Sequence, residues 1–202
     1  MLDDFLIACT VPKLTPSNFY PIIGMLKRIL SDPNINVVQS GIKIMGQLSK
    51  GLRKNFSSAA KIFFPILLGK FKDKKSQIVD ETHKALDMFY FSMPNFEDIF
   101  EDVKIGLNDK VIHAKLNTLI FLDRHIEKLF NNGKNINLMK IGSVIKGLLE
   151  DGASEIRESA LKLIVKLKIK SGDAMNDLLA DISNSRMQKI LEEEKKLLGE
   201  KR

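Results

Sequence analysis

Tryptophan is absent from this 202-residue chain, cysteine occurs once, and long apolar runs are missing. The lone cysteine, Cys9, excludes an internal disulfide, which is typical of a reducing, intracellular compartment. A membrane-spanning helix needs about 20 consecutive apolar residues, and no stretch approaches that length. The segment from Met1 to Leu6 lacks the basic region that opens a secretory signal. We therefore expect a folded intracellular protein without a membrane span.

Patterns that carry catalysis or metal binding are also missing. The three histidines, His83, His113 and His125, lie far apart in sequence, and none pairs with Cys9. Positions in or at the edge of a core are therefore favoured over metal or catalytic roles. No glycine-rich phosphate loop is present, and the run Glu192 to Glu194 is more typical of a solvated helix face. We assign no catalytic residue, no metal ligand and no cofactor, and we expect no enzyme.

The charge is strongly basic. The formal net charge is +7, which favours an acidic partner: nucleic acid, a membrane surface or an acidic protein. From Lys50 to Lys75 there are eight basic residues and one acidic residue. Lys74 and Lys75 stand where two helices reverse direction around Asp73, so packing cannot bury them. An isolated lysine-rich turn is usually just a solvated turn, so the rest of the chain has to decide its meaning.

An internal repeat organises the chain. Four occurrences of an apolar residue followed two positions later by aspartate stand at near-regular spacing, with intervals between the aspartates of 41, 36 and 42 residues. The four copies are Leu30/Asp32, Phe71/Asp73, Leu107/Asp109 and Leu149/Asp151. At 7, 11 and 15 residues after each apolar residue stand Val37, Gly41 and Met45; Ile78, Thr82 and Leu86; Ala114, Thr118 and Leu122; and Ile156, Ala160 and Ile164. Because steps of seven, four and four keep one helix face, each copy predicts a turn followed by an amphipathic helix.

Paired helices with a period near 40 residues are typical of the HEAT and armadillo class. We expect an all-α, HEAT-like α-solenoid of antiparallel helix pairs without strands. The small residue in each buried stripe would let a neighbouring helix approach closely. Since each pair would turn at the same edge, we expect the four aspartates to form one ridge.

We expect one domain over residues 1–202. It comprises a partial first repeat (1–16), second and third repeats (17–93), a fourth (94–134), a fifth (135–171) and a capping pair (172–202). The predicted helix pairs are Asn18–Leu30 with Asn36–Arg53, Ser58–Lys72 with Ser76–Met93, Phe96–Leu107 with Val111–Phe130, and Leu138–Leu149 with Ser154–Lys170. The polar stretch from Asn131 to Asn135 is the expected mobile joint.

The first helix, Met1 to Cys9, has an apolar face and ends before Pro12. It resembles the second helix of a repeat whose first helix is missing. We therefore expect it to be packed on one side only.

Two basic blocks carry a resemblance to a known family. The sequence G-L-R-K-N-F (Gly51 to Phe56), followed by K-F-K-D-K-K (Lys70 to Lys75), resembles the TOG domain of microtubule polymerases. The stretches Asp32 to Val38 and Glu155 to Ala160 are also similar to that family. The resemblance covers nearly the whole chain, but only the Gly51 to Lys75 block is specific. It implies a flat paddle of six HEAT-like repeats whose intra-repeat turns bind the curved, unpolymerised αβ-tubulin dimer.

Carried over position by position, the resemblance implies seven tubulin-binding residues. They are Asn34, Ile35 and Asn36 in the second repeat, Lys74 and Lys75 in the third, Lys110 in the fourth and Arg157 in the fifth. The early turns of the family face β-tubulin, and the fifth faces α-tubulin. The resemblance assigns a binding role to Lys110 less strongly than to the other residues, because many relatives carry a second basic residue or Asn-Pro in that turn.

Two features limit this transfer. The family presents a tryptophan from its first turn, whereas this chain has none and its first repeat begins at a second helix. Either the sequence is truncated or the domain binds differently. Arg157 lies in the first turn of its helix, where the dipole disfavours a cation, so Glu155 and Glu158 could simply neutralise it.

Two other functions stay open at this point. One is a general HEAT scaffold that grips a peptide or helix in a groove, and the other is a basic nucleic-acid-binding solenoid. Nucleic acid is disfavoured, because the basic residues are not interleaved with exposed aromatics. We expect αβ-tubulin as partner, no small-molecule substrate and no membrane, and a location at microtubule ends, spindle or centrosome in the cytoplasm.

Overall fold

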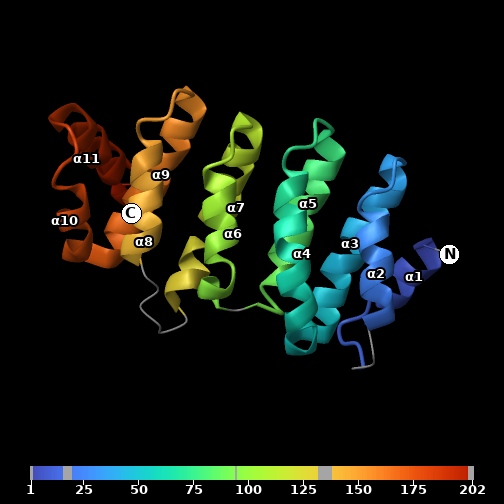
Figure 1. Ribbon diagram of the computed structural model, residues 1–202. Coiled ribbons are helices and arrows are strands. Elements are labelled where there is room, and N and C mark those ends of the chain that lie inside the picture. Colours follow the sequence, from blue (N-terminus) through green and yellow to red (C-terminus); the bar gives the residue numbers. More distant parts are fainter. Residues whose placement is uncertain (1, 16–19, 94, 132–137, 200–202) are drawn as a thin grey trace. The chain divides into compact units, whose positions relative to one another are not determined.

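The computed structural model describes residues 2–15, 20–93, 95–131 and 138–199, and these fold into helices joined by short turns (Figure 1). No strand forms within these ranges. Each helix in them is too short or too polar to cross a bilayer. The predicted all-α fold class is confirmed.

The chain divides into two compact units, Met1–Gly106 and Leu107–Arg202, here called the N-terminal and C-terminal units. The boundary falls inside the expected fourth repeat. The helices of the N-terminal unit are α1 (Leu2–Cys9), α2 (Tyr20–Ile29), α3 (Ile35–Leu52), α4 (Ser57–Lys70), α5 (Ser76–Phe89) and α6 (Phe100–Leu107, whose last residue passes the boundary). Those of the C-terminal unit are α7 (Ile112–Asn131), α8 (Leu138–Leu148), α9 (Ser154–Ser171), α10 (Asn176–Leu179) and α11 (Asn184–Gly199). Short 3₁₀ turns cover Arg53–Phe56, Phe96–Asp98 and Gly172–Met175.

In the N-terminal unit the second helices of successive pairs stack on one another. Helix α3 contacts α1 on one side and α5 on the other, while α4 lies against α5. Ile42, Met45 and Leu48 of α3 are fully buried. Helix α1 thus packs as a second helix, with Cys9 buried and Ile7 71% exposed, which confirms the prediction of one-sided packing.

The small residues of the repeat are buried in all four copies. A Cβ on Gly41 would lie 2.4 Å from the Cγ2 of Ile29, so only glycine lets α2 approach α3 this closely. The buried hydroxyls of Thr82 and Thr118 donate to the carbonyls of Ile78 and Ala114 at 2.7 and 2.8 Å. These hydrogen bonds remove the cost of burying a hydroxyl. The position seven residues after the apolar residue is buried in three copies, at Ile78, Ala114 and Ile156. In the first copy Val37 is only half-buried, and its neighbour Val38 is buried instead.

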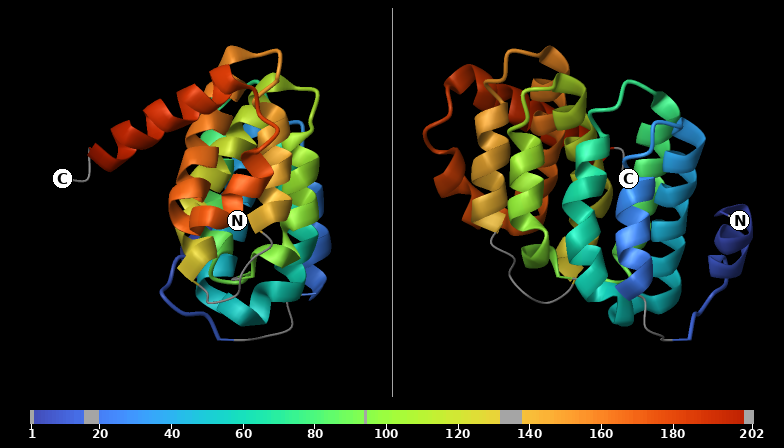
Figure 2. Two further views of the ribbon diagram at one scale, coloured as in Figure 1. Left: turned by 90° about the vertical axis from the view of Figure 1, so that its left-hand side faces the viewer. Right: turned by 45° about the vertical axis from the view of Figure 1, so that its right-hand side comes forward.

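In the C-terminal unit α9 contacts both α7 and α11, and α8 lies against α9. Within α11 only Ile190 is buried among the described residues. The left view of Figure 2 shows the C-terminal end of α11 projecting away from the other helices of its unit. The packed surface of α11 therefore lies before its C-terminal end, where Ile190 is buried and Glu194 pairs with Lys168 of α9 at 2.5 Å.

Where the structure describes them, the predicted helix bounds agree with the observed ones to within four residues, and the predicted start at Asn18 lies outside the described residues. The 3₁₀ turn at Arg53–Phe56 was not predicted. The expected mobile joint, Asn131 to Asn135, lies outside the described residues except for Asn131.

Candidate functional site

The four repeat aspartates shape their turns in the same way. Each Oδ1 accepts a hydrogen bond from the backbone N–H two residues later. The donors are Asn34, Lys75, Val111 and Ala153, at 2.8, 2.9, 3.0 and 3.0 Å. Such an Asx turn replaces a backbone hydrogen bond and lets the chain reverse between two helices. The apolar partners, Leu30, Phe71, Leu107 and Leu149, are buried, so the motif anchors the first helix and sets the turn.

The first described turn presents the predicted residues Asn34 and Asn36 to solvent, with Ile35 half-buried. Asn34 is the N-cap of α3, and its side chain accepts from the N–H of Asn36 at 2.9 Å. Its amide is therefore committed to the helix end. Among the three residues, Asn36 is the one whose side chain is exposed and is not used for capping.

The second turn exposes Lys74 and Lys75. The backbone N–H of Lys75 is held by Asp73, and Lys75 is the N-cap residue of α5. Within the part of the chain that the structure describes, no carboxylate pairs with either ammonium group. Both charges are therefore free to meet an acidic partner.

Several nearby cations are committed to the fold. The Nζ of Lys70 donates to the carbonyl of Leu30 at 2.5 Å, tying α4 to the preceding turn. Lys61 pairs with Asp98 at 2.8 Å, and the guanidinium of Arg53 lies 6.0 Å from the ring centre of Phe91. Fewer positive charges between Lys50 and Lys75 are therefore available for binding than the number of basic residues there suggests.

In the C-terminal unit Lys110 is exposed beside Asp109, whose Oδ1 accepts from Val111. Arg157 is half-buried, and its Nη1 donates to the carbonyls of Asp151 and Gly152 at 2.7 and 2.9 Å. Neither Glu155 nor Glu158 forms an ion pair with Arg157, because the long side chain of Arg157 carries its guanidinium back over the turn. These bonds offset the unfavourable position of a cation in the first turn of a helix.

Neighbouring helices fix the turn between α8 and α9. Lys115 of α7 forms an ion pair with Asp151, and Arg186 of α11 makes two hydrogen bonds to Glu150. The bond from Lys115 and the N–H of Ala153 lower the pKa of the Asp151 carboxyl, although burial opposes them. Hydrogen bonding from Arg186 likewise lowers the pKa of Glu150. The guanidinium of Arg157 therefore lies against a turn that is held on both sides.

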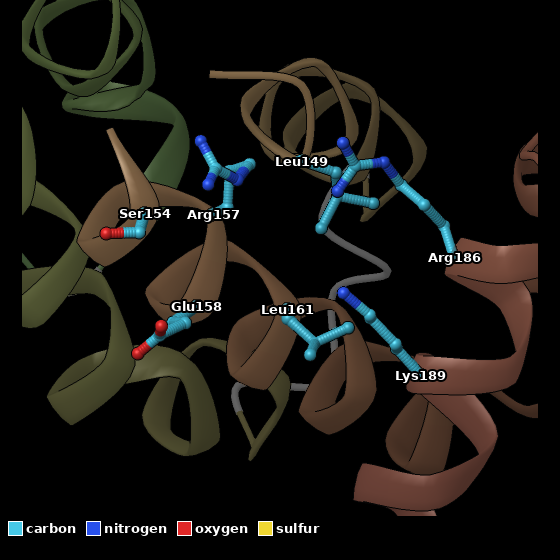
Figure 3. Close-up of a pocket in the computed structure, with 7 residues that line it drawn as sticks. All are labelled: Leu149, Ser154, Arg157, Glu158, Leu161, Arg186 and Lys189. Atoms are coloured by element: carbon cyan, nitrogen blue, oxygen red, sulfur yellow. The ribbon is translucent and has the colours of Figure 1, made fainter. Parts of the chain in front are cut away.

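A small pocket opens beside this turn, between α9 and α11 (Figure 3). Its volume is about 130 Å³, and its lining residues are Leu149, Ser154, Arg157, Glu158, Leu161, Arg186 and Lys189. Sequence reasoning did not find Arg186 and Lys189. They belong to the predicted capping pair, and only the packing of α11 on α9 brings them to the turn.

The four turns are divided between the two units: those at Asp32 and Asp73 belong to the N-terminal unit, and those at Asp109 and Asp151 belong to the C-terminal unit. The four aspartates occupy equivalent turns within their own units, as the repeat predicts. A ridge across both units stays a prediction.

Comparison with known proteins identifies one matching family and several similar proteins. The family model described as CLASP N terminal matches residues 24–192. Protein mini spindles of Drosophila melanogaster is 32% identical over 184 residues, which are 90% of this chain and 9% of that protein. Centrosomal protein 224 of Dictyostelium discoideum is 29% identical over 189 residues, 91% of this chain and 9% of that protein. The chain thus spans about a tenth of the length of these relatives.

Solved structures share the fold. One comes from a study of microtubule plus-end tracking by XMAP215, CLIP-170 and EB1. It matches with a TM-score of 0.80 and 30% identity, over 96% of this chain and 81% of that one. Drosophila melanogaster Mini spindles TOG3 matches with a TM-score of 0.77 and 11% identity, over 96% of this chain and 85% of that one. The latter likeness concerns the fold alone.

Proposed function

The chain belongs to the CLASP N-terminal family and has a TOG-type fold, and we propose that it binds the αβ-tubulin dimer through its intra-repeat turns. In this proposal residues 1–202 act as one TOG-like domain of a microtubule-associated polymerase. Its role is to bind a protein partner, without catalysis. The names of its relatives, which include a centrosomal protein and a spindle pole body component, support action at microtubule ends, spindle or centrosome.

The observation that carries the proposal is the exposed pair Lys74 and Lys75. Neither lysine pairs with a carboxylate in the described residues, and Asp73 fixes the backbone that presents them. Two unpaired cations on a rigid turn are suited to an acidic protein surface, where charge complementarity raises the association rate and specificity. Asn36, Lys110 and Arg157 would add contacts from the neighbouring turns.

The test is a titration of αβ-tubulin against the wild type and the double variant Lys74→Glu/Lys75→Glu. Reversal replaces attraction by repulsion, so we expect affinity to fall about tenfold or more at low salt. Helix content should not change, because neither side chain is buried. Circular dichroism checks this point.

The matched control is Lys50→Glu/Lys54→Glu, which has the same charge change. Lys54 precedes α4 and Lys74 follows it, so they are separated by roughly 20 Å of helix. If both double variants lose affinity equally, net charge and not the turn governs binding. If the folded Lys74/Lys75 variant binds tubulin as the wild type does, the turn is excluded and a general scaffold role is favoured.

A further inference from the structure

The pocket between α9 and α11 combines an apolar floor with a charged rim. Leu149 is buried and Leu161 half-buried beneath it, and Arg186 and Lys189 reach over from α11 (Figure 3). Its volume of about 130 Å³ is well below the several hundred ångström cubed of a typical small-molecule site. The pocket is of a size to receive a single side chain.

Two of the three cations at the rim already have partners. Arg157 donates to the carbonyls of Asp151 and Gly152, and Arg186 holds Glu150 through two hydrogen bonds. Lys189 makes neither an ion pair nor a hydrogen bond within the described residues, and its side chain is exposed. Lys189 is therefore the cation left for an incoming group.

From this arrangement we propose that the pocket receives a glutamate side chain of the bound tubulin, with Lys189 as its anchor. The methylene groups of glutamate would lie on Leu149 and Leu161, and its carboxylate would meet the ammonium of Lys189. Ser154 lines the pocket at the side opposite α11, and Figure 3 shows its hydroxyl directed away from Arg186 and Lys189, which leaves Lys189 as the anchor. This inference rests on the proposed function and extends the interface from the turns to α11.

A single carboxylate fits the charge balance better than a phosphate group. Glu158 also lines the pocket, and a doubly charged phosphate would be repelled by it more strongly. The partial enclosure of the pocket also reduces screening by water and salt, so the contact should be stronger than an equivalent one on an open turn.

The experiment compares αβ-tubulin binding by the wild type, Lys189→Glu, Lys189→Ala and Lys195→Glu. Lys195 is exposed on the same helix and does not line the pocket, so its reversal is the matched control. We expect about tenfold weaker binding for Lys189→Glu, about threefold for Lys189→Ala and under about twofold for Lys195→Glu. Thermal unfolding should be unchanged in all four proteins, because neither lysine is buried.

The outcomes separate this inference from the proposed function. If Lys189→Glu binds as tightly as the wild type while the Lys74/Lys75 reversal is weakened, the pocket is not part of the interface and the turns are. Equal losses in Lys189→Glu and Lys195→Glu would overturn the pocket in favour of overall charge. A wild type that does not bind tubulin would overturn both proposals.

Discussion

At the scale of single residues, Asp151 combines a turn with an ion pair. Its Oδ1 accepts from the N–H of Ala153 at 3.0 Å, and its other oxygen pairs with Lys115. Both side chains are largely buried, at 15% and 16% exposure, so water screens the pair only partly. Asparagine at this position would keep the acceptor and remove only the charge.

We predict that Asp151→Asn lowers the free energy of unfolding by about 1 to 2 kcal/mol at neutral pH. The folded pKa of Asp151 is lowered, chiefly by the hydrogen bond from Lys115. The stabilisation is therefore complete above the unfolded pKa, near 3.9, and is lost as the pH falls through the folded pKa. Urea unfolding from pH 7 to pH 3 should show the difference between wild type and variant shrinking toward zero.

Asp32→Asn is the control for that experiment. Asp32 makes the same Asx turn, and within the described residues it has no ion pair. Its replacement should change stability by less than about 0.5 kcal/mol, as is usual for a surface change that removes no specific contact. A loss for Asp151→Asn that is as large at pH 3 as at pH 7 would contradict the role of the charge.

At the scale of helices, α3 and α9 end in the same way. The residue after each helix has a positive φ, 52° at Arg53 and 57° at Gly172. The N–H of each bonds back to a carbonyl four residues earlier, that of Ser49 or of Lys168. A 3₁₀ turn follows in both cases. Glycine adopts this backbone freely, whereas a residue with a Cβ is strained there.

Gly172→Ala should therefore destabilise the protein by about 1 kcal/mol, because it introduces that strain. For a chain of this size the midpoint of thermal unfolding would fall by about 2 to 4 °C. The matched control is Gly152→Ala, since Gly152 has no neighbour within 4 Å of a Cβ and no positive φ. If calorimetry shows the same small change for both variants, the positive φ at Gly172 is not required.

The repeat predicted these helices because equivalent residues have the same structural role in each copy. Its apolar residue is buried and its aspartate forms the turn at all four places. The strained end at Arg53 could not be predicted, because arginine gives no local signal for a positive φ. The 3₁₀ turn after it was missed for the same reason.

The candidate site was only partly predictable. Exposure of Lys74 and Lys75 followed from their place in a turn. The neighbours of Arg157 did not, because the helix-dipole argument considered only nearby carboxylates and not backbone carbonyls six residues back. Lys189 lies 32 positions after Arg157 in the sequence, and only tertiary packing of α11 brings the two to one pocket.

At the scale of the whole molecule, the excess positive charge is divided between two units. Lys74 and Lys75 belong to the N-terminal unit, and Arg157 belongs to the C-terminal unit. They share no hydrogen-bond or ion-pair partner in the described residues. Substitutions at separate sites without shared partners usually have additive free energies.

We predict that Lys74→Glu/Lys75→Glu and Arg157→Ala weaken tubulin binding independently. If the turns of both units bind one dimer, the affinity loss of the combined variant should equal the product of the two separate losses. Binding of the wild type should also fall as salt is raised from about 50 to 200 mM, because exposed charges are increasingly screened. Titration calorimetry at both salt concentrations measures affinity and stoichiometry together, and circular dichroism confirms that Arg157→Ala, which loosens its turn, still folds.

The alternative is that each unit binds a separate tubulin dimer. Two dimers would then bind per chain, and each variant would weaken one site while the other kept its wild-type affinity. The combined variant would show two weakened sites, with no multiplication of the losses at either. One dimer per chain with multiplied losses requires that both units contact the same partner, since only then does a single binding event lose both sets of contacts.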